Sequence, residues 1–220
     1  MDDDERVRQH YERRHDPTRV LALSDGIVAI IITLLVLELH VPQLAGGQTL
    51  KDAMREVRPS FLAFIITFVV VAIAWAGHRD LFSQIRRTDR ALVWLNIIYM
   101  FPLCLLPFGA SLISRYENDP VALRMYGFIL LAIAVTRLGI WAYATGRPHL
   151  LFAPMDPQSR RAGFAVVVVP AAVYALAIIF ASAAPTASLA IYGAVPVLYF
   201  AGITLARTSA LPGSAERDFT

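Results

Sequence analysis

Residues 19–38 read R-V-L-A-L-S-D-G-I-V-A-I-I-I-T-L-L-V-L-E, a long apolar run behind an opening that contains Arg19, Ser24 and Asp25. The run is close to 20 residues, the length that a helix needs to cross roughly 30 Å of hydrocarbon at about 1.5 Å per residue. A cleavable signal peptide has a shorter apolar core of roughly 7–15 residues. The segment therefore predicts a retained transmembrane helix over residues 20–40.

The rest of the chain repeats this apolar character. Its 220 residues are 57% hydrophobic with a mean hydropathy of +0.56, whereas soluble domains have roughly 45–50% apolar residues. We predict an all-α polytopic membrane protein, with a leader over 1–19, a tail over 207–220, and six helices over 20–40, 60–82, 91–114, 121–143, 162–182 and 187–206. Only residues 182–186 separate the last two helices, so a re-entrant pair is an alternative there.

The basic residues are distributed unevenly among the connections between the predicted helices. Alternate connections carry thirteen Lys and Arg residues on one side and four on the other. The positive-inside rule then predicts a multi-pass protein of the cell membrane with both termini in the cytoplasm. Because the charges lie between apolar blocks, they indicate topology rather than nucleic-acid binding. The single cysteine, Cys104, excludes an intrachain disulfide and a Cys-rich metal motif.

Polar side chains within the first three predicted helices fall at one depth. Asp25 lies about five residues into the first helix, His78 about four residues before the end of the second, and Asn96 about five residues into the third. Alternating helix directions place all three about 6–8 Å from the cytoplasmic end. Polar groups at membrane depth usually face a partner or water. We expect a polar network that also includes Arg19 and Trp75; the alternative is separate snorkelling to the headgroups.

The remainder of the first helix carries an apolar stripe. Leu23, Ile27, Ile30, Leu34 and Leu37 recur at four- and three-residue steps and so share one face. Such a stripe is usually a packing or lipid surface, and composition alone does not mark it as a pore wall. Thr33 lies beside it, and its hydroxyl is expected to bond to the carbonyl one turn earlier unless it has another role.

Residues 19–26, R-V-L-A-L-S-D-G, resemble the R-x-x-x-F-S-D-G signature that opens the first helix of the transmembrane-protein-175 family of potassium channels, in its bacterial six-helix branch. The continuation to Val41-Pro42 is also similar to that family. So are Trp75 with His78 and Leu81-Phe82, and Asn96 with Leu106-Pro107-Phe108. The resemblance covers roughly residues 19–108. Leu23 replaces the phenylalanine of the signature, and Arg79 replaces the second of a frequent histidine pair.

The resemblance implies a potassium-selective homotetramer with a central pore lined by the first helix. It places the constriction at Ile30, with Leu34 and Leu37 as further hydrophobic rings and Thr33 beside them. It also implies that Arg19, Ser24, Asp25, Trp75, His78 and Asn96 anchor the helix. The expected partners are other copies of the chain, the lipid bilayer and the permeant K⁺, with no cofactor, metal or nucleic acid. The T-V-G-Y-G carbonyl filter of ordinary potassium channels is absent from this sequence.

Other functions remain as alternatives. A proton-coupled secondary transporter could use Asp25 and His78 as a relay, although the two halves of the sequence show no obvious repeat of the kind common in transporters. An assembly protein would be silent in a flux assay. We predict no enzyme, because the sequence has no H-E-x-x-H motif, no glycine-rich phosphate loop and no nucleophile-and-base pair at membrane depth.

Overall fold

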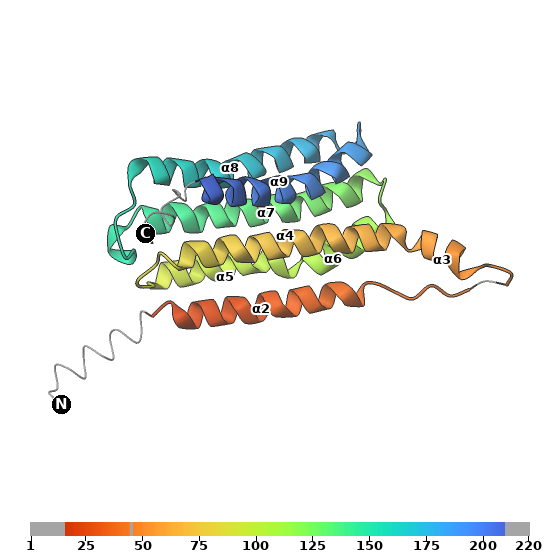
Figure 1. Ribbon diagram of the computed structural model, residues 1–220, viewed down its shortest axis with the longest axis horizontal. Helices are drawn as coiled ribbons and strands as arrows, with labels where there is room; N and C mark the ends of the chain where they lie inside the picture. The colour runs from red at the N-terminus through yellow and green to blue at the C-terminus, as the bar shows by residue number, and fades with distance from the viewer. Residues whose placement is uncertain (1–15, 45, 210–220) are drawn as a thin grey trace, which may run out of the picture.

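The computed structural model describes residues 16–44 and 46–209, with side chains described through residue 198. Most of the predicted leader 1–19 and of the tail 207–220 therefore lies outside the described residues. The regular secondary structure of the described part is helical, with one isolated bridge between Ile85 and Leu151 in the connections. Along the chain the helices are α2 (Thr18–Leu37), α3 (Leu50–Glu56), α4 (Arg58–Phe82), α5 (Arg90–Cys104), α6 (Leu106–Arg115), α7 (Pro120–Thr145), η1 (Pro148–Leu150), α8 (Pro157–Phe180) and α9 (Pro185–Ser209) (Figure 1).

Several of these helices are long and apolar enough to cross a membrane. Among the described residues, α2, α4, the α5–α6 pair, α7 and α8 meet this requirement by length and composition, and α9 has an apolar segment over Pro185–Leu198. The all-helical membrane architecture predicted from the sequence is therefore confirmed. The orientation of the chain and its assembly state stay predictions.

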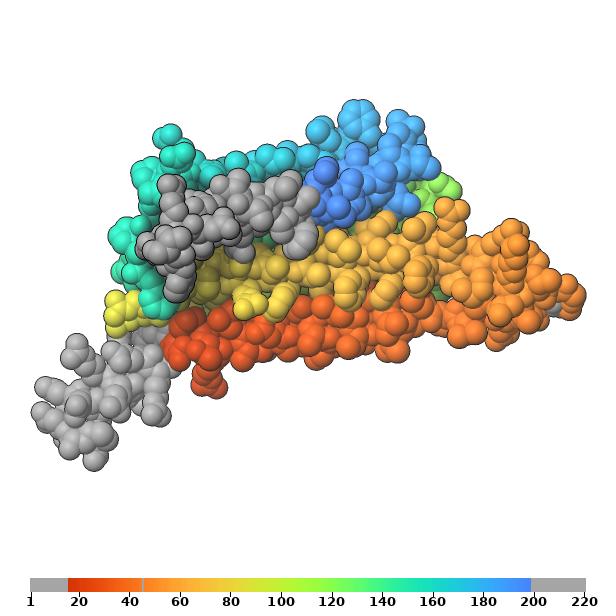
Figure 2. All heavy atoms as spheres, in the orientation of Figure 1, coloured from red at the N-terminus to blue at the C-terminus, as the bar shows by residue number. Residues whose placement is uncertain are grey.

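The helices lie side by side with α2 at one edge (Figure 1). α2 contacts α4, α5 and α6, whereas α8 contacts α7 and α9 on the opposite side of the bundle. The α4–α5 and α7–α8 connections lie at the end of the bundle where α2 begins, and α3 lies at the other end. In the space-filling view α2 forms a continuous strip along the edge (Figure 2).

The third predicted helix, 91–114, is two helices in the structure, and α5 gives way to α6 at Leu105. Pro102 and Pro107 explain the break, because proline has no N–H to bond the carbonyl one turn earlier. The Leu105 N–H bonds to the Pro102 carbonyl at 3.2 Å, a tighter turn, before the Gly109 N–H restores the α-helical pattern with Leu105 at 2.9 Å. The sequence analysis predicted one unbroken helix despite both prolines, because membrane helices often accommodate proline.

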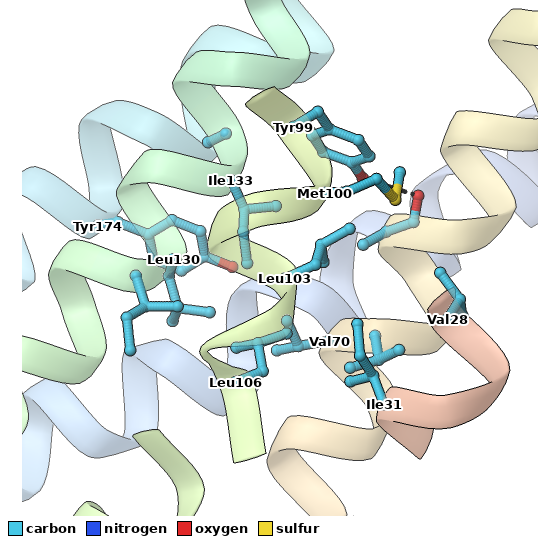
Figure 3. Close-up of a cluster of buried hydrophobic side chains, with 14 of the residues drawn as sticks. Val28, Ile31, Val70, Tyr99, Met100, Leu103, Leu106, Leu130, Ile133 and Tyr174 are labelled. Carbon is cyan, nitrogen blue, oxygen red and sulfur yellow. Dashed lines mark hydrogen bonds between the residues drawn. The ribbon is translucent and has the colours of Figure 1, made fainter. Parts of the chain in front are cut away.

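A buried apolar cluster joins α2 to the rest of the bundle (Figure 3). Val28 and Ile31 of α2 reach toward Val70 of α4 and Leu103 of α5. The cluster continues through Tyr99, Met100, Leu106, Leu130, Ile133 and Tyr174, which come from α5, α6, α7 and α8. The edge helix is thus held by the same core that holds the other spans.

Candidate functional site

The α2 helix buries one narrow face. Ser24, Val28, Ile31 and Leu35 are its buried residues, and their spacing of four, three and four places them on one line along the helix. The side chains around that line are partly or fully exposed. The first helix therefore presents most of its circumference to whatever surrounds a single subunit.

A chain of hydrogen bonds crosses three helices at the buried face of α2. His78 Nε2 of α4 lies 2.7 Å from Asn96 Oδ1 of α5, and Asn96 Nδ2 donates to Ser24 Oγ of α2 at 3.0 Å. The Ser24 hydroxyl donates in turn to the Val20 carbonyl at 3.0 Å. With Asn96 Oδ1 as acceptor, His78 Nε2 is the donor, so each group has one defined role. Because all three side chains are buried, removing one would leave its partners unsatisfied.

The ring of His78 is also held by two aromatic neighbours. It stacks on Phe82 at a centroid distance of 4.3 Å and on Tyr99 at 5.5 Å, nearly parallel to the second ring. The Tyr99 hydroxyl donates to the Ala74 carbonyl at 3.1 Å. The sequence pointed to Phe82 only as part of the family resemblance and did not point to Tyr99, although Phe82 lies one turn after His78 and Tyr99 one turn after Asn96. These contacts fix the rotation of the imidazole.

Asp25 belongs to a second, separate contact. Trp75 Nε1 donates to Asp25 Oδ1 at 2.8 Å, and the Arg79 guanidinium carbon lies 5.6 Å from the centre of the Trp75 ring. Among the described residues no hydrogen bond joins Asp25 to His78 or Asn96, and Arg19 is exposed without a bond to any of these groups. The residues predicted as one polar network are thus arranged as a buried chain and a neighbouring Trp–Asp pair.

The apolar stripe of α2 lies away from the buried face. Ile30, Leu34 and Leu37 are 60%, 43% and 67% exposed. Thr33 is also exposed, and its hydroxyl donates to the Ile30 carbonyl at 2.8 Å. A Cβ added to Gly26, one turn before Ile30, would meet no atom within 4 Å. The four residues predicted to line a pore therefore share an open surface that the subunit does not cover.

The end of α2 borders a polar crevice of about 260 Å³. Glu38 and His40 line it together with Glu56 of α3 and Ser114 of α6. Ser114 shares a hydrogen bond of 2.6 Å with Ser60 of α4. No group of three His, Cys, Asp or Glu side chains within the described ranges could hold a metal ion. The polar side chains of this crevice therefore present oxygen atoms next to the end of the exposed apolar stripe of α2.

Comparison with known proteins shows similarity to a family of ion channels. The model of the family described as endosomal/lysosomal potassium channel TMEM175 matches residues 19–107. A potassium channel of Streptomyces collinus is 33% identical over 148 residues, which span 66% of this chain and 72% of that protein. The human endosomal/lysosomal proton channel TMEM175 is 29% identical over 145 residues, 66% of this chain but only 29% of the human protein.

A solved structure shares the fold as well. The crystal structure of a lysosomal potassium-selective channel TMEM175 homolog from Chamaesiphon minutus superposes with a TM-score of 0.75 at 28% sequence identity. The similarity covers 84% of this chain and 96% of that one. It therefore extends through α7 and α8, beyond the region that the family model matches.

Proposed function

This chain belongs to the TMEM175 family, whose members are ion channels rather than enzymes, and we propose that it is a potassium-selective channel of the cell membrane. In this proposal four copies of the chain assemble around one axis, and α2 of each copy lines a central pore. Both chain termini lie in the cytoplasm. The permeant ion is K⁺, and conduction needs no cofactor.

The observation that carries the proposal is the division of α2 into a held face and an open face. A helix that met only lipid would need no fixed rotation about its axis. A pore helix must present the same side chains to every ion. The bonds that Asn96 donates to Ser24 and Trp75 donates to Asp25 fix the rotation of α2 about its axis. They leave Ile30, Leu34 and Leu37 facing out of the subunit.

Selectivity then follows from hydration. A ring of four isoleucine side chains offers no oxygen atoms to an ion, so an ion that passes Ile30 must shed part of its water. Potassium holds its water less strongly than sodium and loses it at lower cost. Hydrophobic constrictions also close by dewetting, so a small rotation of α2 would stop the current. Thr33 adds weak coordination beside the constriction.

Replacement of Ile30 by Asn tests this mechanism. The amide would wet the constriction and bind either cation, so we expect roughly a tenfold fall in the potassium-over-sodium permeability ratio. The measurement is the reversal potential of the purified protein in bilayers with potassium on one side and sodium on the other. Ile30 is largely exposed, so folding should be unaffected.

The matched control is Ile179→Asn on α8, where the isoleucine is 67% exposed on the opposite side of the bundle. It should leave the reversal potential unchanged. An unaltered reversal potential in Ile30→Asn would remove Ile30 from the constriction. Native mass spectrometry tests the tetramer separately, and a selectively conducting monomer would overturn it.

Proton permeation is the second candidate, because the human relative is named a proton channel. A proton-coupled transporter that relays protons directly between Asp25 and His78 has less support, since these side chains bond to different partners. Liposomes that contain a pH-sensitive dye and no potassium distinguish these functions. A passive proton current indicates a channel, whereas flux that saturates and requires a second solute indicates a transporter.

A further inference from the structure

Two connections at the end of the bundle where α2 begins are joined into one surface (Figure 1). Ile85 of the α4–α5 connection forms an antiparallel bridge with Leu151 of the α7–α8 connection. The Arg86 N–H donates to the Leu150 carbonyl at 2.7 Å, and the Phe152 N–H donates to the Gln84 carbonyl at 3.0 Å. We call residues 83–90 and 146–161 together the basic platform. These backbone bonds hold the two connections together, so their side chains project from one joined surface.

The basic platform has a strong surplus of positive charge. It carries two carboxylates, Asp89 and Asp156, and six arginines: Arg86, Arg87, Arg90, Arg147, Arg160 and Arg161. The connections at the opposite end, residues 38–58 and 115–119, carry four basic and five acidic residues. A concentrated positive surface at only one end of a membrane bundle attracts anionic headgroups in the leaflet that it meets.

The two carboxylates of the platform are turned toward helix ends. Asp89 accepts from the Leu92 N–H at 2.8 Å and from the Tyr143 hydroxyl at 2.7 Å. Asp156 accepts from the N–H groups of Gln158 and Ser159 at 2.9 and 2.8 Å. Both carboxylates therefore cap helices. No ion pair links either of them to a platform arginine among the described residues.

Arginines from different parts of the platform gather at the end of α7. The Arg147 guanidinium carbon lies 3.6 Å from the centre of the Tyr143 ring. A Cβ added to Gly146 would lie 3.9 Å from Arg160 Nη2, so the Arg160 side chain reaches back from α8 to the same place. Guanidinium groups suit phosphate oxygens because they donate two parallel hydrogen bonds. Two neighbouring guanidinium groups can therefore share one phosphate.

Apolar side chains fix the depth of the platform. Phe152 is 69% exposed within it, and Phe164 is exposed two turns into α8. An exposed phenylalanine ring is stabilised by contact with hydrocarbon, and arginines beside it extend to the headgroups. The arginines therefore lie at the level of lipid phosphates, which favours a lipid over a soluble polyanion.

We propose that the basic platform binds a phospholipid whose headgroup carries two phosphates, in the leaflet that meets this end of the bundle. Arg147 and Arg160 hold one phosphate, and Arg86 on the joined connection holds the other. The acyl chains lie against Phe152 and Phe164. The proposal depends on the membrane placement of the chain and is independent of which ion the pore conducts.

Lipid retention measured by native mass spectrometry tests the proposal. The purified protein is mixed with diphosphatidylglycerol or with phosphatidylglycerol at equal total phosphate. We expect retention of one diphosphatidylglycerol per chain and much weaker retention of phosphatidylglycerol. The triple variant Arg86→Gln, Arg147→Gln, Arg160→Gln should lower the affinity for diphosphatidylglycerol roughly a hundredfold, at about fivefold for each arginine.

The matched control removes three cations from the opposite end, Lys51→Gln, Arg55→Gln and Arg58→Gln, and should retain the lipid as the native protein does. Equal retention of the two lipids, or equal loss in the control, would overturn the proposal. So would displacement of the lipid by pyrophosphate at micromolar concentration, which would show that phosphate alone is recognised. If the triple variant does not fold, retention by the native protein at 0.1 and 1 M salt decides, because binding that survives high salt unchanged is not carried by exposed arginines.

Discussion

Leu34 and Leu35 are neighbours on α2, yet 43% of the surface of Leu34 is exposed and only 1% of that of Leu35. The buried face also holds Ser24, a polar residue, whereas the exposed face holds Ile30 and Leu37. Hydropathy therefore does not separate the two faces. In a membrane a polar side chain marks the face that contacts protein, because lipid cannot satisfy its hydrogen bonds.

The largest effect should come from Asn96→Ala, which removes the bridge between His78 and Ser24. His78 loses its acceptor and Ser24 loses the amide that donates to it, and we expect a loss of about 3 kcal/mol in the free energy of unfolding. Thermal or denaturant unfolding in detergent measures it. Asn118→Ala, at an exposed asparagine between α6 and α7, is the control. An Asn96→Ala variant as stable as the native protein would show that the hydrogen bonds among Ser24, Asn96 and His78 do not hold α2 in place.

The leucine pair tests the comparison directly. Leu35→Ala leaves a cavity in the core, and we expect it to lower the unfolding free energy by about 2 kcal/mol, near the lower limit for buried leucines because lipid is as apolar as leucine. Leu34→Ala should change it by less than about 0.5 kcal/mol and should alter the single-channel current instead. Unfolding in detergent and single-channel recording are applied to both variants. Equal destabilisation would mean that the two faces are not distinct.

A smaller effect is expected from Trp75→Phe, which keeps an aromatic ring but removes the N–H that donates to Asp25. The expected loss is about 1 kcal/mol, the value of one interhelical hydrogen bond. The closing behaviour of the channel should change more than its stability, since this contact limits rotation of α2. The control is Trp94→Phe on α5, at a tryptophan that is 56% exposed. If the two variants open and close alike, the bond between Trp75 and Asp25 does not limit the rotation of α2.

The sequence predicted the depth of the polar residues along their helices better than the direction in which each side chain points. Counting residues from the helix ends placed Asp25, His78 and Asn96 at one level, and His78 and Asn96 are indeed bonded to each other. The same count could not show that Ser24 rather than Asp25 completes the chain. Adjacent residues differ by about 100° around a helix, so their assignment requires the buried face, which depends on contacts with α4 and α5. The bridge between Ile85 and Leu151 left no signal in the sequence either, because it also depends on how distant helices pack together.

The Ser24–Asn96–His78 chain also has a consequence for biogenesis. Its members lie on α2, α4 and α5, which leave the ribosome in that order. Ser24 enters the bilayer before Asn96 and His78 are synthesised, with only the Val20 carbonyl of its own helix as a partner, and His78 follows without an acceptor. Only Asn96, on the third span, bonds to both side chains. The rotation of the first helix about its axis is therefore fixed only after three spans have been inserted. A nascent polypeptide that stalls before α5 would leave α2 free to rotate in the lipid.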